Sequence, residues 1–224
     1  PALIAVGEET RYLGDAVALV AAKTKKGLRE ALDLIKVDYE ELEPISSPEM
    51  ALSEEAPKIH EKGNILSHEV LKRGNADEVI AKSKYKVTRR YSTPFTEHAF
   101  LEPESALAVR EGDGVTIYTS TQGAYDVQRE CSELLGLPKE KVRAIVKLVG
   151  GGFGGKEDMS VQHHAALLAW YTTKPVKVTL TRQESIIVHP KRHPMEMEFT
   201  TACDENGKLT AMKARVIADT GAYA

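Results

Sequence analysis

The chain of 224 residues has little of several features that mark special classes of protein. Its two cysteines, Cys131 and Cys203, are too few for a disulfide framework, a zinc knuckle or cysteine-bound iron–sulfur clusters. No apolar run approaches the length of a membrane span, and the N-terminus lacks the basic-then-apolar layout of a signal peptide. A net charge of −3 gives no reason to expect nucleic acid or membrane lipid as a partner. These absences favour a cytoplasmic protein with reduced thiols.

What is present is typical of an ordinary globular protein. Hydrophobic residues make up 42% of the chain and charged residues 28%, and the length allows one or two domains. Apolar residues stand almost directly at both ends, at 1–6 and 215–218, where free-standing domains usually carry polar residues. We therefore expect a piece of a larger protein, or a subunit that is completed by another chain.

The first part of the chain is expected to form a β-α-β unit. Residues 16–22 are apolar and predict a buried strand, residues 27–35 carry apolar side chains at helical spacing, and residues 37–41 alternate as in a half-exposed strand. Pro44 and Pro48 end this unit, and a polar connection follows.

The rest of the chain predicts alternating strands and helices. A capping box at Asn75–Glu78 opens a short helix, and Asn206-Gly207 is the turn of a hairpin. The predicted strands are 84–91, 99–109, 115–120, 142–149, 176–180, 195–202 and 209–218, and the longer predicted helices are 124–135 and 160–171. The fold class is therefore α+β, in two parts that divide between residues 45 and 80.

A block of glycines is the most informative feature. Gly150–Gly155 contains five glycines and Phe153, and it lies between a predicted strand and a predicted helix. Because glycine costs stability in regular structure, this density indicates main chain brought close to something that a Cβ would push away. An anionic cofactor is one candidate, since free N–H groups and a helix N-terminus favour negative charge. A tight turn without a ligand is the simpler alternative.

Two nucleotide-binding patterns overlap the block. The phosphate-loop pattern G-x-x-x-x-G-K fails, because Glu157 stands where the motif needs Ser or Thr. The pattern G-x-G-x-x-G fits Gly150, Gly152 and Gly155, and Arg182 at the end of the following strand could serve a 2′-phosphate. An NADP-binding oxidoreductase domain therefore remains an alternative.

The run 149–157, taken with Ser120-Thr121-Gln122 upstream, resembles the molybdenum-binding subunit of the xanthine dehydrogenase family. Further segments match in order and spacing: Tyr12–Asp15, Thr96–Pro103, Leu135–Pro138 and Ala218–Tyr223. The resemblance covers essentially the whole chain. It implies that residues 1–60 are the C-terminal part of a hammerhead-like α/β domain with its connection. Residues 61–224 would then be the truncated first part of a molybdopterin-binding domain with a mixed sheet.

The resemblance also implies roles near the metal. Gln122 matches the glutamine whose amide donates to the apical oxo ligand of molybdenum, and Phe153 and Gly154 match the loop residues closest to the metal. Gln122 and Phe153 would thus lie beside molybdenum without ligating it. Gly152 and Gly155 complete the expected cofactor-binding loop. Read from the residues alone, Gln122 is equally suited to cap the helix that starts at Ala124.

Glu157 matches a carboxylate that contacts substrate in the purine-oxidising members of the family. An acid at this position suits a polar, nitrogen-containing heterocycle better than a simple aldehyde. The simpler alternative is that Glu157 and Asp158 stabilise the positive end of the following helix.

By the same resemblance, the whole enzyme would be a molybdopterin-dependent oxidoreductase. It would hydroxylate a purine, such as xanthine or hypoxanthine, or a related N-heterocycle, with water as the oxygen source. Iron–sulfur clusters and FAD would lie on partner subunits or fused domains. The general base is expected beyond residue 224, together with the remainder of the molybdenum subunit. The chain would then hold no catalytic residue and would be inactive alone.

Other conspicuous side chains receive simpler interpretations. His98 belongs to the matched segment and is expected to have a structural role near the cofactor. His189 and His193 bracket a basic cluster that we interpret as an exposed loop, with an anion path as the alternative. Cys131 lies on the apolar face of its helix and is expected to be buried and inert.

Overall fold

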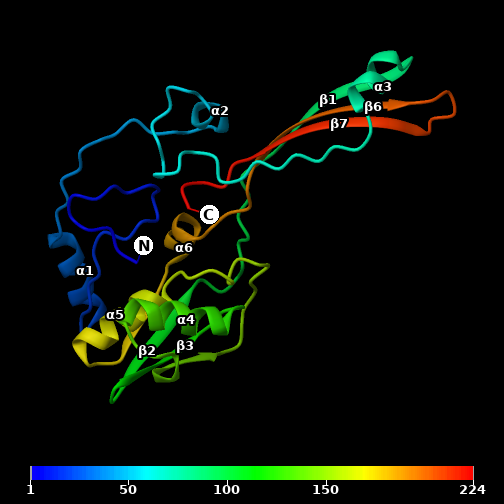
Figure 1. Ribbon diagram of the computed structural model, residues 1–224. Helices are drawn as coiled ribbons and strands as arrows, with labels where there is room; N and C mark the ends of the chain where they lie inside the picture. The colour runs from blue at the N-terminus through cyan, green and yellow to red at the C-terminus, as the bar shows by residue number, and fades with distance from the viewer. Residues whose placement is uncertain (1, 224) are drawn as a thin grey trace. The chain divides into compact units, whose positions relative to one another are not determined.

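The computed structural model describes residues 2–223 and contains two compact units (Figure 1). Unit 1 combines residues 1–40 with residues 97–191, and unit 2 combines residues 41–96 with residues 192–224. Each unit thus joins segments that are distant in the sequence. The expected division into domains at residues 1–60 and 61–224 stays a prediction.

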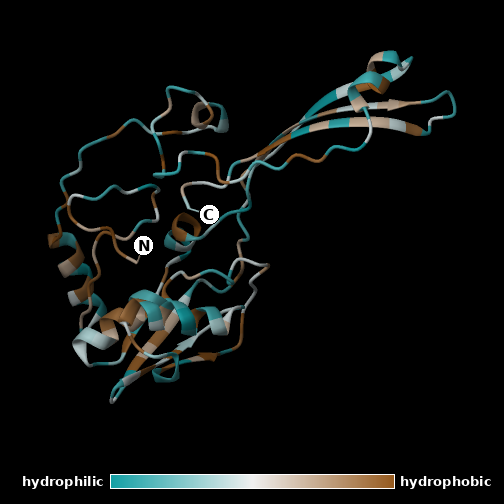
Figure 2. Cartoon of the chain, viewed as in Figure 1, coloured by the Kyte–Doolittle hydropathy of each residue, from teal (hydrophilic) through white to brown (hydrophobic). Residues whose placement is uncertain are grey.

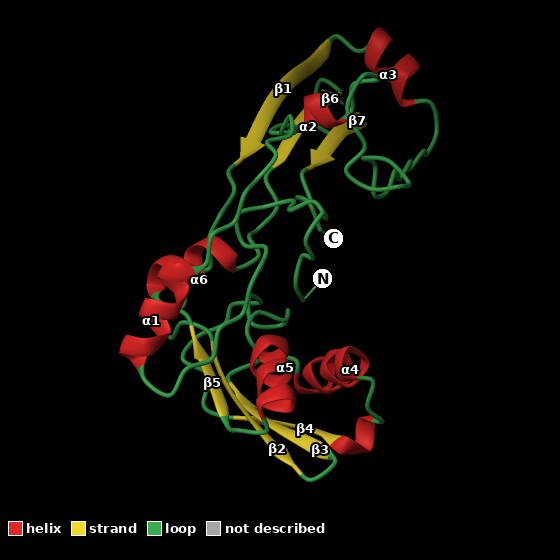
Figure 3. Ribbon diagram, turned by 90° about the vertical axis from the view of Figure 1, so that its left-hand side faces the viewer, coloured by secondary structure: helices red, strands yellow, loops and turns green. Residues whose placement is uncertain are grey.

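A four-stranded mixed sheet forms the centre of unit 1, in the order β4-β3-β2-β5. The strands are β2 (Ser105–Glu111), β3 (Gly114–Thr119), β4 (Val142–Val146) and β5 (Val176–Thr179). Strand β2 pairs antiparallel with β3 and β5, whereas β3 and β4 are parallel. The helices α4 (Ala124–Leu135) and α5 (Gln162–Thr172) cover one face of the sheet (Figure 3). Their contact with the sheet encloses the core.

Local sequence explains the helix α4 and the strand that follows it. Gly136 takes the left-handed conformation with φ 63°, and the N–H of Leu137 donates to the carbonyl of Ser132, which closes the helix end. Pro138 then leads through a short 3₁₀ turn, η1 (Lys139–Lys141), into β4. The parallel pair β3 and β4 is therefore joined by a helical crossover, as parallel strands require.

The rest of unit 1 is less regular. The helix α1 (Lys25–Leu34) forms where it was predicted, and α6 (Arg182–Val188) was not predicted. The predicted strands at 16–22 and 37–41 are wrong, because both segments are irregular. A strand needs a hydrogen-bonded neighbour, and neither segment forms a ladder with any residue between 2 and 223.

Unit 2 contains a three-stranded antiparallel sheet in the order β1-β6-β7. Its strands are β1 (Tyr85–Thr93), β6 (Met195–Cys203) and β7 (Leu209–Ala218), and the last two form the predicted hairpin. Hydrophobic and hydrophilic residues alternate over residues 195–200 of β6, whereas β7 ends in the apolar run 216–218 (Figure 2). The short helices α2 (Pro48–Ala51) and α3 (Ala76–Lys82) complete the unit, and Asn75 caps α3 as predicted.

The α+β fold class and the mixed sheet are confirmed. Strand β2 starts later than predicted: Ala99 has φ 49°, outside the extended region, and the ladder begins at Ser105. Among residues 2–223 we find no helix that combines the length and the apolar character needed to span a membrane.

Candidate functional site

The parallel strands β3 and β4 bring the two matched segments together. Both strands end at the same edge of the sheet, so that residues 120–122 and the glycine block lie side by side. The N–H of Gln122 donates to the carbonyl of Lys156 at 2.8 Å, and the hydroxyl of Thr121 donates to the same oxygen at 2.9 Å. Ligands of open α/β sheets bind beyond the carboxyl ends of parallel strands, and this is such an edge.

The side chain of Gln122 is held by the glycine block. Its Oε1 accepts hydrogen bonds from the N–H groups of Gly154, at 3.2 Å, and Lys156, at 3.1 Å. Two N–H donors identify this atom as the amide oxygen and orient the whole amide group. The Nε2 atom of this exposed side chain has no hydrogen-bond partner among residues 2–223. Gln122 therefore presents two N–H donors away from the loop.

Three of the glycines are needed because other side chains of this protein lie against them. A Cβ on Gly152 would stand 2.3 Å from Oε1 of Gln122, and a Cβ on Gly150 would stand 2.6 Å from Cβ of Glu102. A Cβ on Gly155 would stand 2.5 Å from Cε1 of His189. The close approach that the glycine density indicated is thus an approach to protein atoms at these positions.

The outer side of the loop is open. Phe153 has φ 55° and an exposed ring, and a Cβ on Gly154 would meet no atom within 4 Å. The N–H groups of Gly151, Gly152 and Phe153 form no hydrogen bond with residues 2–223. A bulky residue with positive φ is strained, and such strain often marks functional sites. These free main-chain N–H groups and the amide of Gln122 are hydrogen-bond donors without a net charge. Such donors suit the binding of an oxygen-rich anionic group.

A buried ion pair supports the loop from within. Lys156, whose side chain is 1% exposed, contacts Glu102 with Nζ 2.7 Å from Oε2 and lies over the ring of Phe100. The same Glu102 oxygen accepts from the N–H of Gly150 at 2.8 Å. Partial burial alone would raise the pKa of Glu102, but the hydrogen bonds from Lys156 and Gly150 outweigh it and lower the pKa. The lysine therefore stabilises the loop from inside and does not face a ligand.

His189 lies buried beneath the loop, so the expectation that its segment is an exposed loop is wrong for this residue. Its Nε2 is 2.6 Å from the carbonyl oxygen of Gly155, and its Nδ1 is 3.3 Å from Oε1 of Glu97. The ring of His98 meets it edge-on with centroids 5.0 Å apart. His193, in unit 2, is exposed as expected.

Glu97, His98 and His189 place one potential metal ligand each within 4.8 Å of one another. Lys191, however, contacts this carboxylate with Nζ 2.7 Å from Oε2 of Glu97. Burial alone would raise the pKa of Glu97, but hydrogen bonds from Lys191 and from the N–H of Ala99 lower it. The ammonium group already supplies the cation that this cluster needs, and we do not interpret it as a metal centre.

The arrangement of Arg182 argues against the NADP alternative. Its Nη2 donates to the main-chain carbonyls of Phe100, at 2.5 Å, and Leu101, at 3.0 Å. Strand β5 pairs antiparallel with β2 and does not continue a parallel β-α-β unit. The helix α5 begins at Gln162, well after the last glycine, so its N-terminus is not at the loop. The dinucleotide interpretation of Gly150, Gly152 and Gly155 is therefore not supported.

Glu157 has an exposed side chain directly after the loop. The structure thus brings Gln122, the glycine block, Phe153 and Glu157 to one edge of unit 1, although their roles stay predictions. Sequence reasoning missed the packing of His189 and the pairing of Lys156 with Glu102. One signal was present in the sequence. Thr181 and Glu184 have the spacing of a capping box, which predicts the start of α6 and places His189 at the end of that helix.

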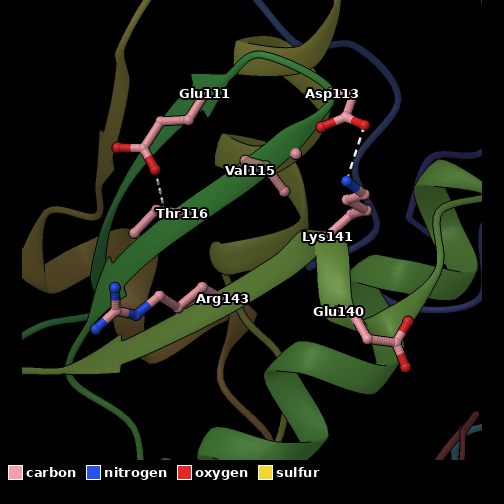
Figure 4. Close-up of a pocket in the computed structure, with 8 residues that line it drawn as sticks. Glu111, Asp113, Val115, Thr116, Glu140, Lys141 and Arg143 are labelled. Atoms are coloured by element: carbon pink, nitrogen blue, oxygen red, sulfur yellow. Dashed lines mark hydrogen bonds and ion pairs between the residues drawn. The ribbon is translucent and has the colours of Figure 1, made fainter.

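A separate pocket lies at the opposite end of the strands (Figure 4). It is lined by residues at the starts of β3 and β4, including Val115 and Arg143. Two of its charged groups form an ion pair, with Nζ of Lys141 2.9 Å from Oδ2 of Asp113. This pocket is at the amino ends of the parallel pair and is not part of the glycine-loop site.

Comparison with known proteins agrees with the resemblance. A family model described as the molybdopterin cofactor-binding domain matches residues 59–224. The chain is 41% identical over 218 residues to a probable xanthine dehydrogenase subunit of Bacillus subtilis (strain 168), covering 97% of this chain and 29% of that protein. It is 43% identical over 220 residues to the nicotinate dehydrogenase large molybdopterin subunit of Eubacterium barkeri, covering 98% of this chain and 52% of the relative.

Solved structures show the same architecture. The aldehyde oxidoreductase from Desulfovibrio gigas superposes with a TM-score of 0.88 at 26% identity, covering 94% of this chain and 24% of that chain. Quinoline 2-oxidoreductase from Pseudomonas putida 86 superposes with a TM-score of 0.86 at 27% identity, covering 96% of this chain and 28% of that one. The chain thus spans between about a quarter and about half of the length of these proteins.

Proposed function

This chain belongs to the molybdopterin cofactor-binding domain family, and we propose that it forms one wall of the cofactor site in a molybdenum hydroxylase. The observation that carries the proposal is the amide of Gln122. Its oxygen is fixed by Gly154 and Lys156, so that its two N–H donors face away from the loop, with no partner in the described part of the chain. A cofactor with oxo groups would accept from such donors without gaining a competing ligand.

The residues of this chain would bind and orient the cofactor. Gln122 and the main chain of Gly152–Gly155 would face it, and Phe153 would lie next to the metal without ligating it. When bound, the molybdenum cofactor supplies the redox chemistry of hydroxylation, with water as the source of oxygen. The protein groups described here add hydrogen-bond donors and exclude side chains from the cofactor's side of the loop.

The proposed substrate is a purine, such as xanthine or hypoxanthine, or a related N-heterocycle. The support is Glu157, which is exposed at the same edge as the loop and offers a carboxylate to ring N–H groups. The relatives named for xanthine and nicotinate point to N-heterocycles, whereas the aldehyde oxidoreductase shows that the fold also serves aldehydes. The acid at position 157 favours the heterocycle.

We further propose a place for this chain in a larger cytoplasmic enzyme. Residues 1–60 would end a hammerhead-like α/β domain and residues 61–224 would begin the molybdopterin-binding domain; the family match from residue 59 supports the second range. The remainder of the molybdenum subunit would supply the general base and further pterin contacts. Iron–sulfur clusters and FAD on partner subunits or fused domains would remove the electrons.

A substrate panel tests the proposal in the intact enzyme that contains this chain. Dye reduction is expected with xanthine or hypoxanthine and not with a simple aldehyde. Glu157→Gln should raise KM for the purine about tenfold and leave kcat nearly unchanged, because a charged hydrogen bond is lost. Asp158→Asn is the matched control, since it removes the neighbouring charge alone. Faster turnover of the aldehyde would contradict the substrate class.

The isolated chain provides a second test. Residues 1–224 alone should show no purine-dependent dye reduction, because the general base is proposed to lie elsewhere. They should also show no binding of NADPH in an equilibrium titration. Sustained purine turnover by this chain would refute the proposed division of the active site.

A further inference from the structure

His189 carries the strongest further observation in the chain. Its side chain is fully buried, and its Nε2 lies 2.6 Å from the carbonyl oxygen of Gly155. A carbonyl can only accept a hydrogen bond, so the hydrogen must be on Nε2 and the ring is the donor. The proposed cofactor site assigns no role to this histidine.

The accepting carbonyl belongs to the same planar peptide group as the N–H of Lys156. That N–H donates to Oε1 of Gln122 at 3.1 Å. One rigid peptide group is therefore held from both sides, by the imidazole of His189 at its oxygen and by the amide of Gln122 at its hydrogen. Hydrogen bonds in such a chain polarise and strengthen one another.

The loop is shaped to receive the ring. A Cβ on Gly155 would stand 2.5 Å from Cε1 and 2.6 Å from Nε2 of His189, so that only glycine leaves room for the hydrogen bond. The N–H of Gly155 also donates to the carbonyl of Gly152 at 2.8 Å, which closes the turn directly before this peptide group.

The ring itself is fixed by its surroundings. His189 follows α6, and its N–H donates to the carbonyl of Ser185 at 3.0 Å. The ring of Phe100 meets it perpendicularly with centroids 4.9 Å apart, and Glu97 faces Nδ1 at 3.3 Å. The histidine is thus a preorganised donor with a buried, fully enclosed side chain.

We propose that His189 is a positioning residue for the amide of Gln122. It holds the 155–156 peptide group, and this peptide group holds the Gln122 oxygen, so that the two outward N–H donors of Gln122 keep their direction. The consequence for a bound cofactor rests on the proposed function, whereas the hydrogen-bond chain is a property of the polypeptide itself.

Hydrogen exchange at the Lys156 amide tests this directly, in the intact polypeptide that contains this chain. His189→Leu keeps the apolar volume and removes the donor, and exchange at Lys156 should become about tenfold faster. His189→Gln places an N–H donor at similar reach and should restore exchange to within about threefold of the wild type. His193→Leu removes an exposed histidine and serves as the control, with no change expected.

A structural role alone would give a different result. If His189→Gln exchanged as fast as His189→Leu, the ring's packing rather than its donor would be responsible, and the proposal would be wrong. Unchanged exchange in His189→Leu would also overturn it. Should His189→Leu fail to fold, His189→Asn, whose amide is too short to reach Gly155, replaces it with the same expected acceleration.

The cofactor content of the same preparations separates the two proposals. A wild-type enzyme that contains no molybdenum or pterin would contradict the proposed function and leave the exchange result standing. In a loaded enzyme, His189→Leu should lower kcat about tenfold with little change in KM, because the ring does not touch substrate. A rise in KM with unchanged kcat would count against a positioning role.

Discussion

The two sheets of this protein differ in whether a layer of helices packs against them. In unit 1, five of the six residues of β3 are buried, whereas in unit 2 all nine residues of β1 are exposed. Every residue of β1 pairs with β6 along one edge, β3 pairs with β2 and β4 on both sides, and both strands are rich in residues that favour strands. The difference is the layer formed by α4 and α5, which covers one face of the unit 1 sheet. Hydrogen bonding to a neighbour is enough to form a strand, but a hydrophobic core requires a second layer packed on the sheet.

Gln122 and the glycine block belong to the covered sheet, and this placement has a physical reason. Gln122 and the glycine block follow directly from β3 and β4, whose side chains Val115, Ile117 and Val142 are fully buried. A site whose hydrogen bonds must keep their geometry needs supports that do not move. In unit 2 most apolar residues of β1 and β7 are exposed and those of β6 are mostly half-buried, so this sheet offers weaker support within residues 2–223.

The largest effect is expected from the core of unit 1. Ile117→Ala removes three buried carbons from a fully enclosed side chain and should lower the free energy of unfolding by about 3 kcal/mol. Urea unfolding followed by fluorescence of Trp170, the single tryptophan, reports on α5 of this unit. Val87→Ala in β1, where the side chain is 45% exposed, should leave the Trp170 transition in place. Equal shifts in both variants would remove the distinction between the two sheets.

Two glycines provide the next comparison. Gly152→Ala would place its Cβ 2.3 Å from Oε1 of Gln122, and this overpacking should cost about 2 kcal/mol and displace the amide. In Gly207→Ala, in the hairpin turn of unit 2, the new Cβ would meet no atom within 4 Å. The substitution should lower the free energy of unfolding by only about 1 kcal/mol, because alanine is strained at φ 78°. Metal analysis of the intact enzyme should find molybdenum lost from Gly152→Ala alone. Full molybdenum content in Gly152→Ala would contradict the cofactor role of the loop.

Much of the fold could be predicted from the sequence because its signals are local. The helix at 124–135 was predicted with the observed bounds, since Gly136 and Pro138 end it, and Asn206-Gly207 located the hairpin. The strands predicted at 16–22 and 37–41 failed because a strand depends on a partner elsewhere, and the local pattern says nothing of whether one is present.

The site was predictable in part through the resemblance to the family, which placed Gln122 beside the glycine block. The structure gives the physical reason: each segment follows a strand, and the two strands are parallel neighbours that end at one edge. The burial of His189 could not be predicted, since it depends on Gly155, 34 positions earlier in the chain. The glycine density was interpreted as room for a ligand, but a sequence does not distinguish room for a ligand from room for an imidazole.

Acid should weaken unit 1 through His163, a half-buried histidine of α5. Burial, assisted by the neighbouring His164, lowers the pKa of His163 to about 3, while in the unfolded chain it is about 6.5. The unfolded state therefore binds a proton between these values that the folded state does not. The contribution of His163 to stability is full above about pH 6.5 and is lost as the pH falls toward 3.

Denaturant unfolding at several pH values measures this. The stability difference between the wild type and His163→Leu should fall by about 1 kcal/mol per pH unit from pH 6 to pH 4. His68→Leu changes an exposed histidine of unit 2 and serves as the control. Its Trp170 unfolding transition should match that of the wild type at every pH in this range. A stability difference between wild type and His163→Leu that stays constant with pH would mean that His163 binds its proton equally in the folded and unfolded states, so that its pKa is not lowered by folding.

The smallest effect concerns the two thiols, one in each unit. Burial raises the pKa of Cys131 in α4 to about 12, so that almost no reactive thiolate exists near pH 8. Cys203 in β6 is partly exposed. Iodoacetamide should therefore modify Cys203 first in the native protein, with peptide mapping to locate the adduct. In Cys203→Ser the remaining thiol should react only as Trp170 reports unfolding, because Cys131 becomes accessible only when the core opens. If iodoacetamide labelled Cys131 in the native protein as fast as Cys203, then α4 would not exclude the reagent from the core.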